Sequence, residues 1–371
     1  MSCSDCISNV PRSVEYFETI REATDTQLLP LSGSMELTLK CNVRCKHCYI
    51  LYPGATDHEM NTDEVKRMLD IMSDNGVLVL LLTGGEPVTR PDFKEIWAYA
   101  KQKGFILSLY SNATLINEDL ASFLASHLPR RVEITIYGHT EETYESVTGV
   151  RGSYQRFRQG VDFLHRYKVP IAFKTMVMKS NVHEFHDMKK WAEDQGCTFR
   201  FDTMINPRIN GDREVLKERL DPEQLAAFEA TLEGSREFME NYAQDIRRAG
   251  TTDSMFSCGA GVKSFHIDPA GQLHPCMLWR KSPYDLRNKP LEEGWRDHVS
   301  NLRARKAPKT GCNSCSNRGV CGRCPAASFL EMNDPGKSVP YHCKVGEARR
   351  KYHIGSFKPI EIARRHLSNS V

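Results

Sequence analysis

Residues 35–49 read MELTLKCNVRCKHCY, a run of apolar residues followed at once by three cysteines. The run Met35–Leu39 predicts a β-strand. The cysteines follow in the next loop with the spacing Cys41-x3-Cys45-x2-Cys48. Three thiolates cannot saturate the four irons of a 4Fe–4S cluster, so such a site leaves one iron open to an outside ligand. The alternative is a zinc site in which His47 completes the three cysteines.

From Met35–Leu39 onward, short apolar runs alternate along the chain with amphipathic helical segments. Further strands are expected at Val77–Leu82, Ile106–Tyr110, Val132–Ile136, Ile171–Val177 and Phe199–Asp202. Helices are expected at Thr62–Asp74, Asp92–Lys103, Asn117–Ala125, Tyr154–Tyr167 and His183–Gln195. Six βα units predict an α/β fold with a parallel sheet, and they are fewer than the eight of a closed barrel. We therefore expect a partial (β/α)6 barrel with its site at the carboxyl ends of the strands.

Other regions flank this barrel. We expect an N-terminal extension at 1–34, the barrel at 35–210, a helical connection at 211–257, a cysteine-rich domain at 258–350 and a tail at 351–371. The extension should contain one helix near Ser13–Ala23, and the connection a long charged helical stretch, Pro222–Arg248. The small cysteine-rich α+β domain should contain a hairpin around Asp268–Gly271 and a helix near Leu291–Arg305.

The composition is that of an ordinary globular protein. The 50 Lys and Arg residues against 47 Asp and Glu residues leave a net charge of +3, which gives no argument for a nucleic-acid or membrane partner. The longest apolar run, Val77–Leu82, is far shorter than a membrane-spanning helix, and no secretory signal is expected. We therefore expect a cytoplasmic protein whose 13 cysteines stay reduced and serve as metal or redox ligands.

A glycine-rich turn, TGGEP at Thr83–Pro87, closes the second expected strand. Glycine lets the backbone approach a ligand closely, and a carboxylate suits a cation. Together with the CxxxCxxC loop one strand earlier, this turn resembles the radical S-adenosylmethionine (SAM) superfamily. The resemblance implies that Cys41, Cys45 and Cys48 hold a catalytic 4Fe–4S cluster whose open iron binds SAM. In that family an electron from the cluster cleaves SAM to a 5′-deoxyadenosyl radical.

The same resemblance implies contacts with SAM, from Gly84, Gly85, Glu86, His47, Ser111 and Asn112. The turn would bind the SAM ammonium group through its backbone and its carboxylate, and His47 occupies the usual aromatic position before the third cysteine. Ser111 and Asn112 end the third expected strand, where the family often places groups near the SAM ribose or carboxylate. A helix N-cap or a turn is the alternative role for these two residues.

Three positions depart from the family pattern. Tyr137 stands where several relatives have an acidic residue, and Tyr144 and Thr148 stand where relatives often have His and Arg. The resemblance therefore does not identify the residues that contact the SAM ribose and carboxylate. Arg151 and Lys174 are candidates to make these contacts in place of the family's residues.

A second group of cysteines lies near the carboxyl end. Cys258 is followed by twelve residues, Gly271, four residues and Cys276, and later come Cys312-x2-Cys315-x5-Cys321-x2-Cys324 and Cys343. This spacing resembles the SPASM extension of radical SAM enzymes, with the last gap of the run one residue shorter than usual. The resemblance implies two auxiliary 4Fe–4S clusters, the first bound by Cys258, Cys276 and Cys324 and the second by Cys312, Cys315, Cys321 and Cys343. Two structural zinc sites are the alternative.

The first auxiliary cluster then lacks a fourth cysteine. Its remaining iron is either open or bound by a residue from elsewhere, with Cys3, Cys6 and Cys197 as the spare thiols. We expect Cys197 to be a buried inert thiol, and Cys3 and Cys6 to be an exposed pair without a role.

These features predict a radical SAM enzyme with three 4Fe–4S clusters that abstracts a hydrogen atom from its substrate. Resemblance to the family's peptide maturases implies that the substrate is a ribosomally made peptide or protein, modified by a crosslink, a thioether or an oxidation. The expected partners are a flavodoxin- or ferredoxin-type electron donor and a separate leader-peptide binding protein. Tyr137, Arg200 and Asp202 are expected to face the cavity, as substrate contacts or as structural hydrogen-bonding residues, and no catalytic acid or base is identifiable.

Two other functions fit parts of the sequence. One is a radical SAM dehydrogenase or decarboxylase that acts on a small molecule or a tetrapyrrole. The other is a non-catalytic zinc or iron–sulfur binding module. The GGEP turn beside the CxxxCxxC loop favours an enzyme, since a structural site has no need for an open iron beside an ammonium-binding loop.

Overall fold

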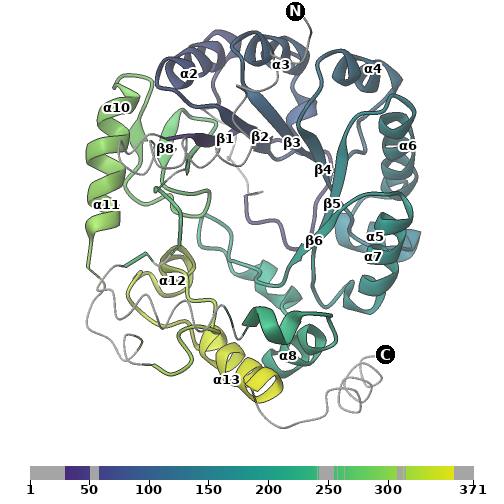
Figure 1. The fold of residues 1–371 in the computed structure, drawn as a ribbon, viewed down its shortest axis with the longest axis vertical. Coiled ribbons are helices and arrows are strands. Elements are labelled where there is room, and N and C mark those ends of the chain that lie inside the picture. Colours follow the sequence, from purple (N-terminus) through teal and green to yellow (C-terminus); the bar gives the residue numbers. More distant parts are fainter. Residues whose placement is uncertain are drawn as a thin grey trace, which may run out of the picture.

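The computed structural model describes residues 30–50, 58–239, 241, 255–256, 258–262, 264–306, 312 and 315–354. Over these residues the chain forms a nine-stranded sheet in the order β6-β5-β4-β3-β2-β1-β7-β8-β9. The strands curve around an inner space, and helices α2 to α7 cover their outer side (Figure 1). None of the helices in the described ranges is long and apolar enough to cross a membrane.

The first six strands confirm the expected partial barrel. They are β1 (Ser32–Thr38), β2 (Val79–Gly84), β3 (Ile106–Ser111), β4 (Arg131–Thr135), β5 (Ile171–Met176) and β6 (Phe199–Asp202). Each pairs in parallel with its neighbour, so their carboxyl ends lie at one edge of the sheet. That edge carries the cysteine loop after β1 and the glycine turn after β2.

The barrel helices are α2 (Thr62–Asp74), α3 (Phe93–Gln102), α4 (Glu118–Ser126), α5 (Glu141–Thr148), α6 (Ser153–Arg166) and α7 (Phe185–Asp194). The apolar pattern predicts all of these except α5. Helix α5 buries Thr143 and Thr148 beside Tyr144 and Val147, so its inner face lacks the apolar period that identifies a helix. Its N-cap is Thr140, whose side chain accepts a hydrogen bond from the Thr143 backbone.

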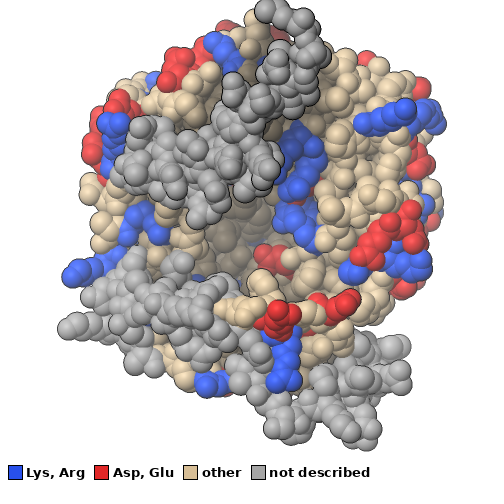
Figure 2. Space-filling model, in the orientation of Figure 1, with Lys and Arg blue, Asp and Glu red and all other residues tan. Residues whose placement is uncertain are grey.

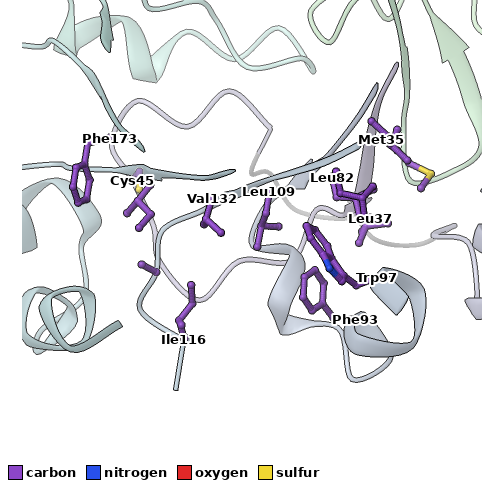
Figure 3. Close-up of a cluster of buried hydrophobic side chains, with 14 of the residues drawn as sticks. Met35, Leu37, Cys45, Leu82, Phe93, Trp97, Leu109, Ile116, Val132 and Phe173 are labelled. Carbon is purple, nitrogen blue, oxygen red and sulfur yellow. The ribbon is translucent and has the colours of Figure 1, made fainter. Parts of the chain in front are cut away.

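The main core lies between the strands and the outer helices. Leu82, Leu109 and Val132 extend from three successive strands, and Phe93 and Trp97 of α3 lie beneath them (Figure 3). All five side chains are at most 3% exposed. Cys45 belongs to the same buried cluster, so the cysteine loop rests directly on the barrel core.

The cysteine-rich region continues the barrel sheet. Strand β7 (Ser264–Ile267) pairs in parallel with β1, and β8 (Gln272–His274) and β9 (Tyr284–Asp285) follow as antiparallel strands. The expected hairpin turn therefore joins β7 to β8. The helix expected near Leu291–Arg305 is present as α10 (Leu291–Glu293), a π-helical segment (Gly294–Val299) and α11 (Ser300–Ala304). Helices α12 (Pro325–Met332) and α13 (Pro340–Ile354) follow.

The connecting helical stretch predicted at Pro222–Arg248 is interrupted in the structure. Helix α8 (Pro222–Ala230) begins with a capping box at Asp221 and ends at Ala230, and helical structure resumes only at residues 235–239. Gly234 between them has φ +71°, a left-handed conformation that cannot continue an α-helix. Most of the remaining predicted stretch, and the helix expected near Ser13–Ala23, lie outside the described residues.

Candidate functional site

The cysteine loop is tied to the end of β1 by a carboxylate from the following segment. Glu59 accepts hydrogen bonds from the Thr38 hydroxyl at 2.9 Å and from the Leu39 backbone at 2.7 Å. These bonds satisfy polar groups at the point where the strand stops and the loop begins. The loop therefore leaves the sheet in a fixed direction.

The other side of the loop rests on the carboxyl end of α5. The Arg44 backbone donates to the Thr148 carbonyl at 2.7 Å, and the Lys46 backbone donates to the Val147 carbonyl at 3.0 Å. The last carbonyls of a helix have no partner within the helix, so they are free to accept these bonds. The unexpected helix thus positions Cys45, which lies between the two donors.

The glycine turn after β2 packs against the cysteine loop through the backbone. The Gly85 and Glu86 amides donate to the carbonyls of Thr38 and Lys40, each at 2.8 Å. A Cβ atom on Gly84 would lie 2.2 Å from the Thr38 oxygen, and one on Gly85 would lie 2.2 Å from the Lys40 oxygen. Only glycine permits this approach, so both glycines are required for the two loops to meet.

Glu86 is completely buried and binds the end of β3. One carboxylate oxygen accepts from the Ser111 hydroxyl at 2.9 Å, and the other accepts from the Asn112 backbone at 2.6 Å. Burial raises the pKa of Glu86 to about 7, although these hydrogen bonds oppose the shift. Glu86 is not among the described residues that line the cavity, so a contact with the SAM ammonium group stays a prediction.

Asn112 connects β3 to the cysteine loop. Its side-chain nitrogen donates to the Asn42 side chain at 2.9 Å and approaches the Cys41 sulfur at 3.9 Å. Its side-chain oxygen accepts from the Thr114 backbone at 2.9 Å, a local turn contact of the kind considered as the alternative role. Ser111 and Asn112 both line the cavity, so turn formation and ligand contact are compatible here.

A cavity of about 400 Å³ opens beside these loops, and Figure 2 shows the central hollow on this face of the molecule. It is lined by side chains of the barrel and of the cysteine-rich region. They include Cys41, Cys45, Cys48, His47, Tyr49, Ser111, Asn112, Tyr137, Lys174, Arg200, Asp202, Met277 and Leu278. Tyr137, Arg200 and Asp202 therefore lie at the cavity as expected. Arg151 is exposed outside this lining, so of the two candidate replacements only Lys174 is placed there.

Tyr137 and Tyr144 surround the second cysteine. Burial raises the pKa of Cys45 far above its ordinary value, and a hydrogen bond from the Tyr137 hydroxyl opposes that shift. The Tyr137 ring lies 5.7 Å from the His47 ring and 5.5 Å from the Tyr144 ring. The buried Tyr144 hydroxyl and the His47 Nδ1 atom have no hydrogen-bond partner within the described ranges. Of these two residues His47 lines the cavity, so an unpartnered polar atom lies beside the space where a cluster and its ligand would fit.

The geometry of the thiols bears on the zinc alternative. In the described part of the chain, no three His, Cys, Asp or Glu side chains converge closely enough to hold one metal ion. A zinc site needs its ligands about 2.0–2.3 Å from a single ion. Thiolates at the corners of a 4Fe–4S cluster bind different irons, so they lie farther apart.

The structure brings the carboxyl-terminal thiols together in two groups. Burial first, and then the neighbouring thiols of Cys324 and Cys258, raise the pKa of Cys276 to about 11. The second group is Cys312, Cys315, Cys321 and Cys343, because Cys321 and Cys343 each interact electrostatically with the other members. These neighbours are the same cysteines as in the two ligand sets implied by the resemblance, and cluster binding by them stays a prediction. Cys197 is only partly buried, not the buried thiol that was expected. Its pKa is raised by desolvation alone, so no thiol neighbour is evident there, while Cys3 and Cys6 lie outside the described residues.

Two residues that the sequence patterns did not indicate join the cysteine loops. The Tyr49 hydroxyl donates to the Met277 sulfur at 3.2 Å, so the residues that follow Cys48 and Cys276 touch each other. Arg280 donates to both carboxylate oxygens of Glu36 on β1, each at 2.9 Å. No local signal could have identified these contacts, because the partners are more than two hundred residues apart.

Comparisons with known proteins agree with this site. The profile of the Radical SAM superfamily matches residues 35–192. An AdoMet-dependent heme synthase of Nitratidesulfovibrio vulgaris is 27% identical, covering 81% of this chain and 88% of the relative. The antilisterial bacteriocin subtilosin biosynthesis protein AlbA of Bacillus subtilis is 26% identical, and the match covers 80% of this chain and 67% of that protein. Streptococcus suis SuiB bound to the precursor peptide SuiA shares the fold with a TM-score of 0.65 at 16% identity, covering 90% and 82%.

Proposed function

Because the chain is a radical SAM enzyme with a SPASM-type cysteine-rich region, we propose that it modifies a ribosomally synthesised peptide or protein. The observation that carries this proposal is the cavity, which borders Cys41, Cys45 and Cys48 and extends to Met277 and Leu278. A substrate in it lies between the catalytic cysteine loop and the Cys276 segment. The bacteriocin biosynthesis protein and the peptide-bound SuiB support a peptide as that substrate.

The roles of the chain's own residues follow from the site. Cys41, Cys45 and Cys48 hold the catalytic cluster, while Tyr137 donates to a ligand thiolate and Asn112 fixes the loop. When bound, the cluster and SAM supply the radical that abstracts a hydrogen atom from the substrate. The aromatic and apolar cavity wall excludes water and holds one C–H bond toward the loop.

Two auxiliary clusters complete this proposal. The first would be bound by Cys258, Cys276 and Cys324, and the second by Cys312, Cys315, Cys321 and Cys343. Both thiol groups suit redox centres that remove an electron from the product radical, as a crosslink, a thioether or an oxidation requires. A flavodoxin- or ferredoxin-type protein would reduce the catalytic cluster, and a separate protein would present the leader peptide.

The second candidate function is oxidation or decarboxylation of a tetrapyrrole. It is favoured by the heme synthase relative, whose identity with this chain is as high as that of the bacteriocin protein. Lys174 and Arg200 at the cavity would suit the propionate groups of such a substrate.

The first test is metal analysis beside SAM cleavage. The protein is purified without oxygen and reconstituted, and iron, sulfide, zinc and dithionite-dependent 5′-deoxyadenosine are measured for the wild type, Cys45→Ala and the control Cys197→Ala. We expect about twelve irons per chain, four for each cluster, and loss of the nucleoside only in Cys45→Ala. Stoichiometric zinc without the nucleoside would contradict the proposal.

A second test separates the two substrate classes. The reconstituted enzyme is given SAM, reductant and either a short peptide encoded beside its gene or iron-coproporphyrin III. Loss of hydrogen mass from the peptide, localised by fragmentation, supports the peptide maturase. Loss of carbon dioxide from the porphyrin with an unchanged peptide favours the tetrapyrrole enzyme instead.

A further inference from the structure

Three positively charged side chains share one face of strands β4 to β6, and we call them the cationic wall: Arg131, Lys174 and Arg200, of which Lys174 and Arg200 line the cavity. Lys174 on β5 is the register partner of Arg200 on β6. In a parallel pair such neighbours project from the same face of the sheet, so two like charges stand side by side. Figure 2 shows Lys and Arg side chains at the rim of the central hollow.

One carboxylate serves both arginines of this wall. Glu133 on β4 is 3% exposed and accepts from the Arg131 Nε atom at 2.8 Å and from the Arg200 Nε atom at 2.9 Å. Arg200 also donates to the Tyr110 hydroxyl at 2.7 Å. The single negative charge of Glu133 is therefore shared between two guanidinium groups, and it attracts Lys174 only from beyond ion-pair distance.

Lys174 is partly buried and has no carboxylate within ion-pair distance among the described residues. Its ammonium group lies over the Tyr110 ring and forms no ion pair with any residue in the described ranges. Desolvation, and then the positive charge of Arg200, lower the pKa of Lys174 well below its ordinary value, against the attraction of Glu133 and Glu86. An ammonium group that is largely withdrawn from water and has no direct ion-pair partner is costly, and here it lines the cavity, where an incoming ligand can reach it.

We propose that Lys174 and Arg200 form a subsite for a carboxylate group of the substrate, an assignment that rests on the proposed use of this cavity for substrate. The subsite lies on β5 and β6, across the barrel from the loops after β1 and β2 that would hold the cluster and SAM. A bound carboxylate supplies the counter-charge that Lys174 lacks and accepts charge-assisted hydrogen bonds from both side chains. It therefore fixes which end of the substrate lies away from the catalytic loop.

Binding measurements on the reconstituted protein test this subsite. The variants are Lys174→Met, which keeps the length of the side chain without its charge, Lys174→Arg as the conservative rescue, and Lys189→Met as the control. Lys189 is an exposed lysine of α7 paired with Glu193 at 2.6 Å, outside the cavity. The carboxylate probes are acetyl-Gly-Glu-Gly-amide and coproporphyrin III, and their neutral counterparts are the glutamine peptide and the porphyrin tetramethyl ester.

The expected result is selective for charge. At least one carboxylate probe should bind the wild type and the control, and it should bind Lys174→Met about tenfold more weakly, with recovery in Lys174→Arg. The neutral counterparts should not distinguish the variants. If binding of the glutamate peptide depends on Lys174, the result supports both the subsite and the peptide substrate. If only the binding of coproporphyrin depends on Lys174, the subsite is supported but the substrate is a tetrapyrrole rather than a peptide.

Three results would overturn the subsite. One is equal binding of acidic and neutral probes, and another is the absence of saturable binding of both acidic probes to the wild type. The third comes from SAM itself, whose affinity is measured by equilibrium dialysis of the same proteins. A tenfold loss of SAM affinity in Lys174→Met would assign the ammonium group to the SAM carboxylate rather than to the substrate.

Discussion

At the scale of single residues, Tyr137 illustrates how a departure from the family pattern acquires a physical role. The residue stands where the resemblance to the radical SAM superfamily leads us to expect an acid, and its hydroxyl donates a hydrogen bond to the Cys45 thiol. Donors to a ligand sulfur stabilise the extra negative charge of a reduced cluster. Tyr137 is therefore expected to tune the catalytic cluster as well as to line the cavity.

Tyr137→Phe should shift the reduction potential of the catalytic cluster to a more negative value, because the donor to Cys45 is lost. The potential is measured by redox titration with electron paramagnetic resonance. Tyr167→Phe is the control, since that hydroxyl pairs with Glu118 on the outer side of the barrel. An unchanged potential in Tyr137→Phe would show that the hydroxyl does not reach the cluster ligand.

Glu86 gives a prediction about pH. Burial raises its pKa from the ordinary 4.5 to about 7, so the native state holds this proton more tightly than the unfolded chain. The stabilising contribution is complete below pH 4.5 and is lost as the pH rises through 7. Glu86→Gln cannot titrate at this position, so its free energy of unfolding lacks this dependence on pH. The difference in free energy of unfolding, variant minus wild type, should therefore rise by up to about 3 kcal/mol between low and high pH.

Anaerobic urea denaturation of Glu86→Gln and wild type between pH 5 and 8 measures this difference. Glu59→Gln is the comparison, because the Glu59 carboxylate also accepts a hydrogen bond at the start of the cysteine loop but is only partly buried. A stability difference between Glu86→Gln and wild type that stays constant across the pH range would rule out the buried proton.

At the scale of elements, the site depends on three loops that hold one another. The cysteine loop rests on the ends of α5, the glycine turn packs against it through the backbone, and the end of β3 joins both through Asn112. Parallel strands place these loops at one edge of the sheet, and short backbone contacts then fix their spacing. Gly84 and Gly85 are therefore needed for the turn to pack against the cysteine loop, whether or not they also contact SAM.

Gly85→Ala should destabilise the protein by about 3 kcal/mol, because the added methyl group meets a backbone oxygen that cannot move independently. The iron content after reconstitution should fall with it. Gly76→Ala is the matched control, since a Cβ atom there has nothing within 4 Å and only the positive φ of +77° costs about 1 kcal/mol. Equal losses of stability in Gly85→Ala and Gly76→Ala would show that the contact between the two loops does not contribute more to stability than the backbone conformation alone.

At the scale of the whole molecule, buried ion pairs join the connection to the cysteine-rich region. Arg219 pairs with Glu331, and Glu229 of α8 pairs with Arg349 of α13, with every side chain at most 9% exposed. Together with the pairing of β7 to β1, these contacts hold the carboxyl-terminal thiols against the barrel. The division into domains at 210 and 257 stays a prediction, and strong interactions cross both limits.

Arg349→Met should lower the free energy of unfolding by about 3–5 kcal/mol, because Glu229 is left buried without its counter-charge. The double variant Glu229→Leu/Arg349→Met should recover most of that loss, since an apolar pair needs no counter-charge. Urea denaturation of the single and double variants measures both effects. A double variant as unstable as Arg349→Met would show that the loss comes from packing or from the Val320 carbonyl that Arg349 also binds.

The sequence by itself determined the six βα units, the loop that carries Cys41, Cys45 and Cys48, and the spacing of the carboxyl-terminal cysteines, whose grouping into two ligand sets is implied only by the resemblance to the SPASM extension. Each of these features is written in local spacing, either an apolar period or a fixed interval between thiols. Where the local period fails, so does the prediction: α5 buries polar residues, and the helix expected over Pro222–Arg248 stops before Gly234.

Only the tertiary structure decided which distant residues meet. It placed β7 beside β1, the Tyr137 hydroxyl on Cys45, and Lys174 beside Arg200 without a carboxylate of its own. These contacts arise from strand order and register, which join positions far apart in the chain. A local pattern specifies each strand but not its neighbour, because pairing is settled by the burial of the whole sheet.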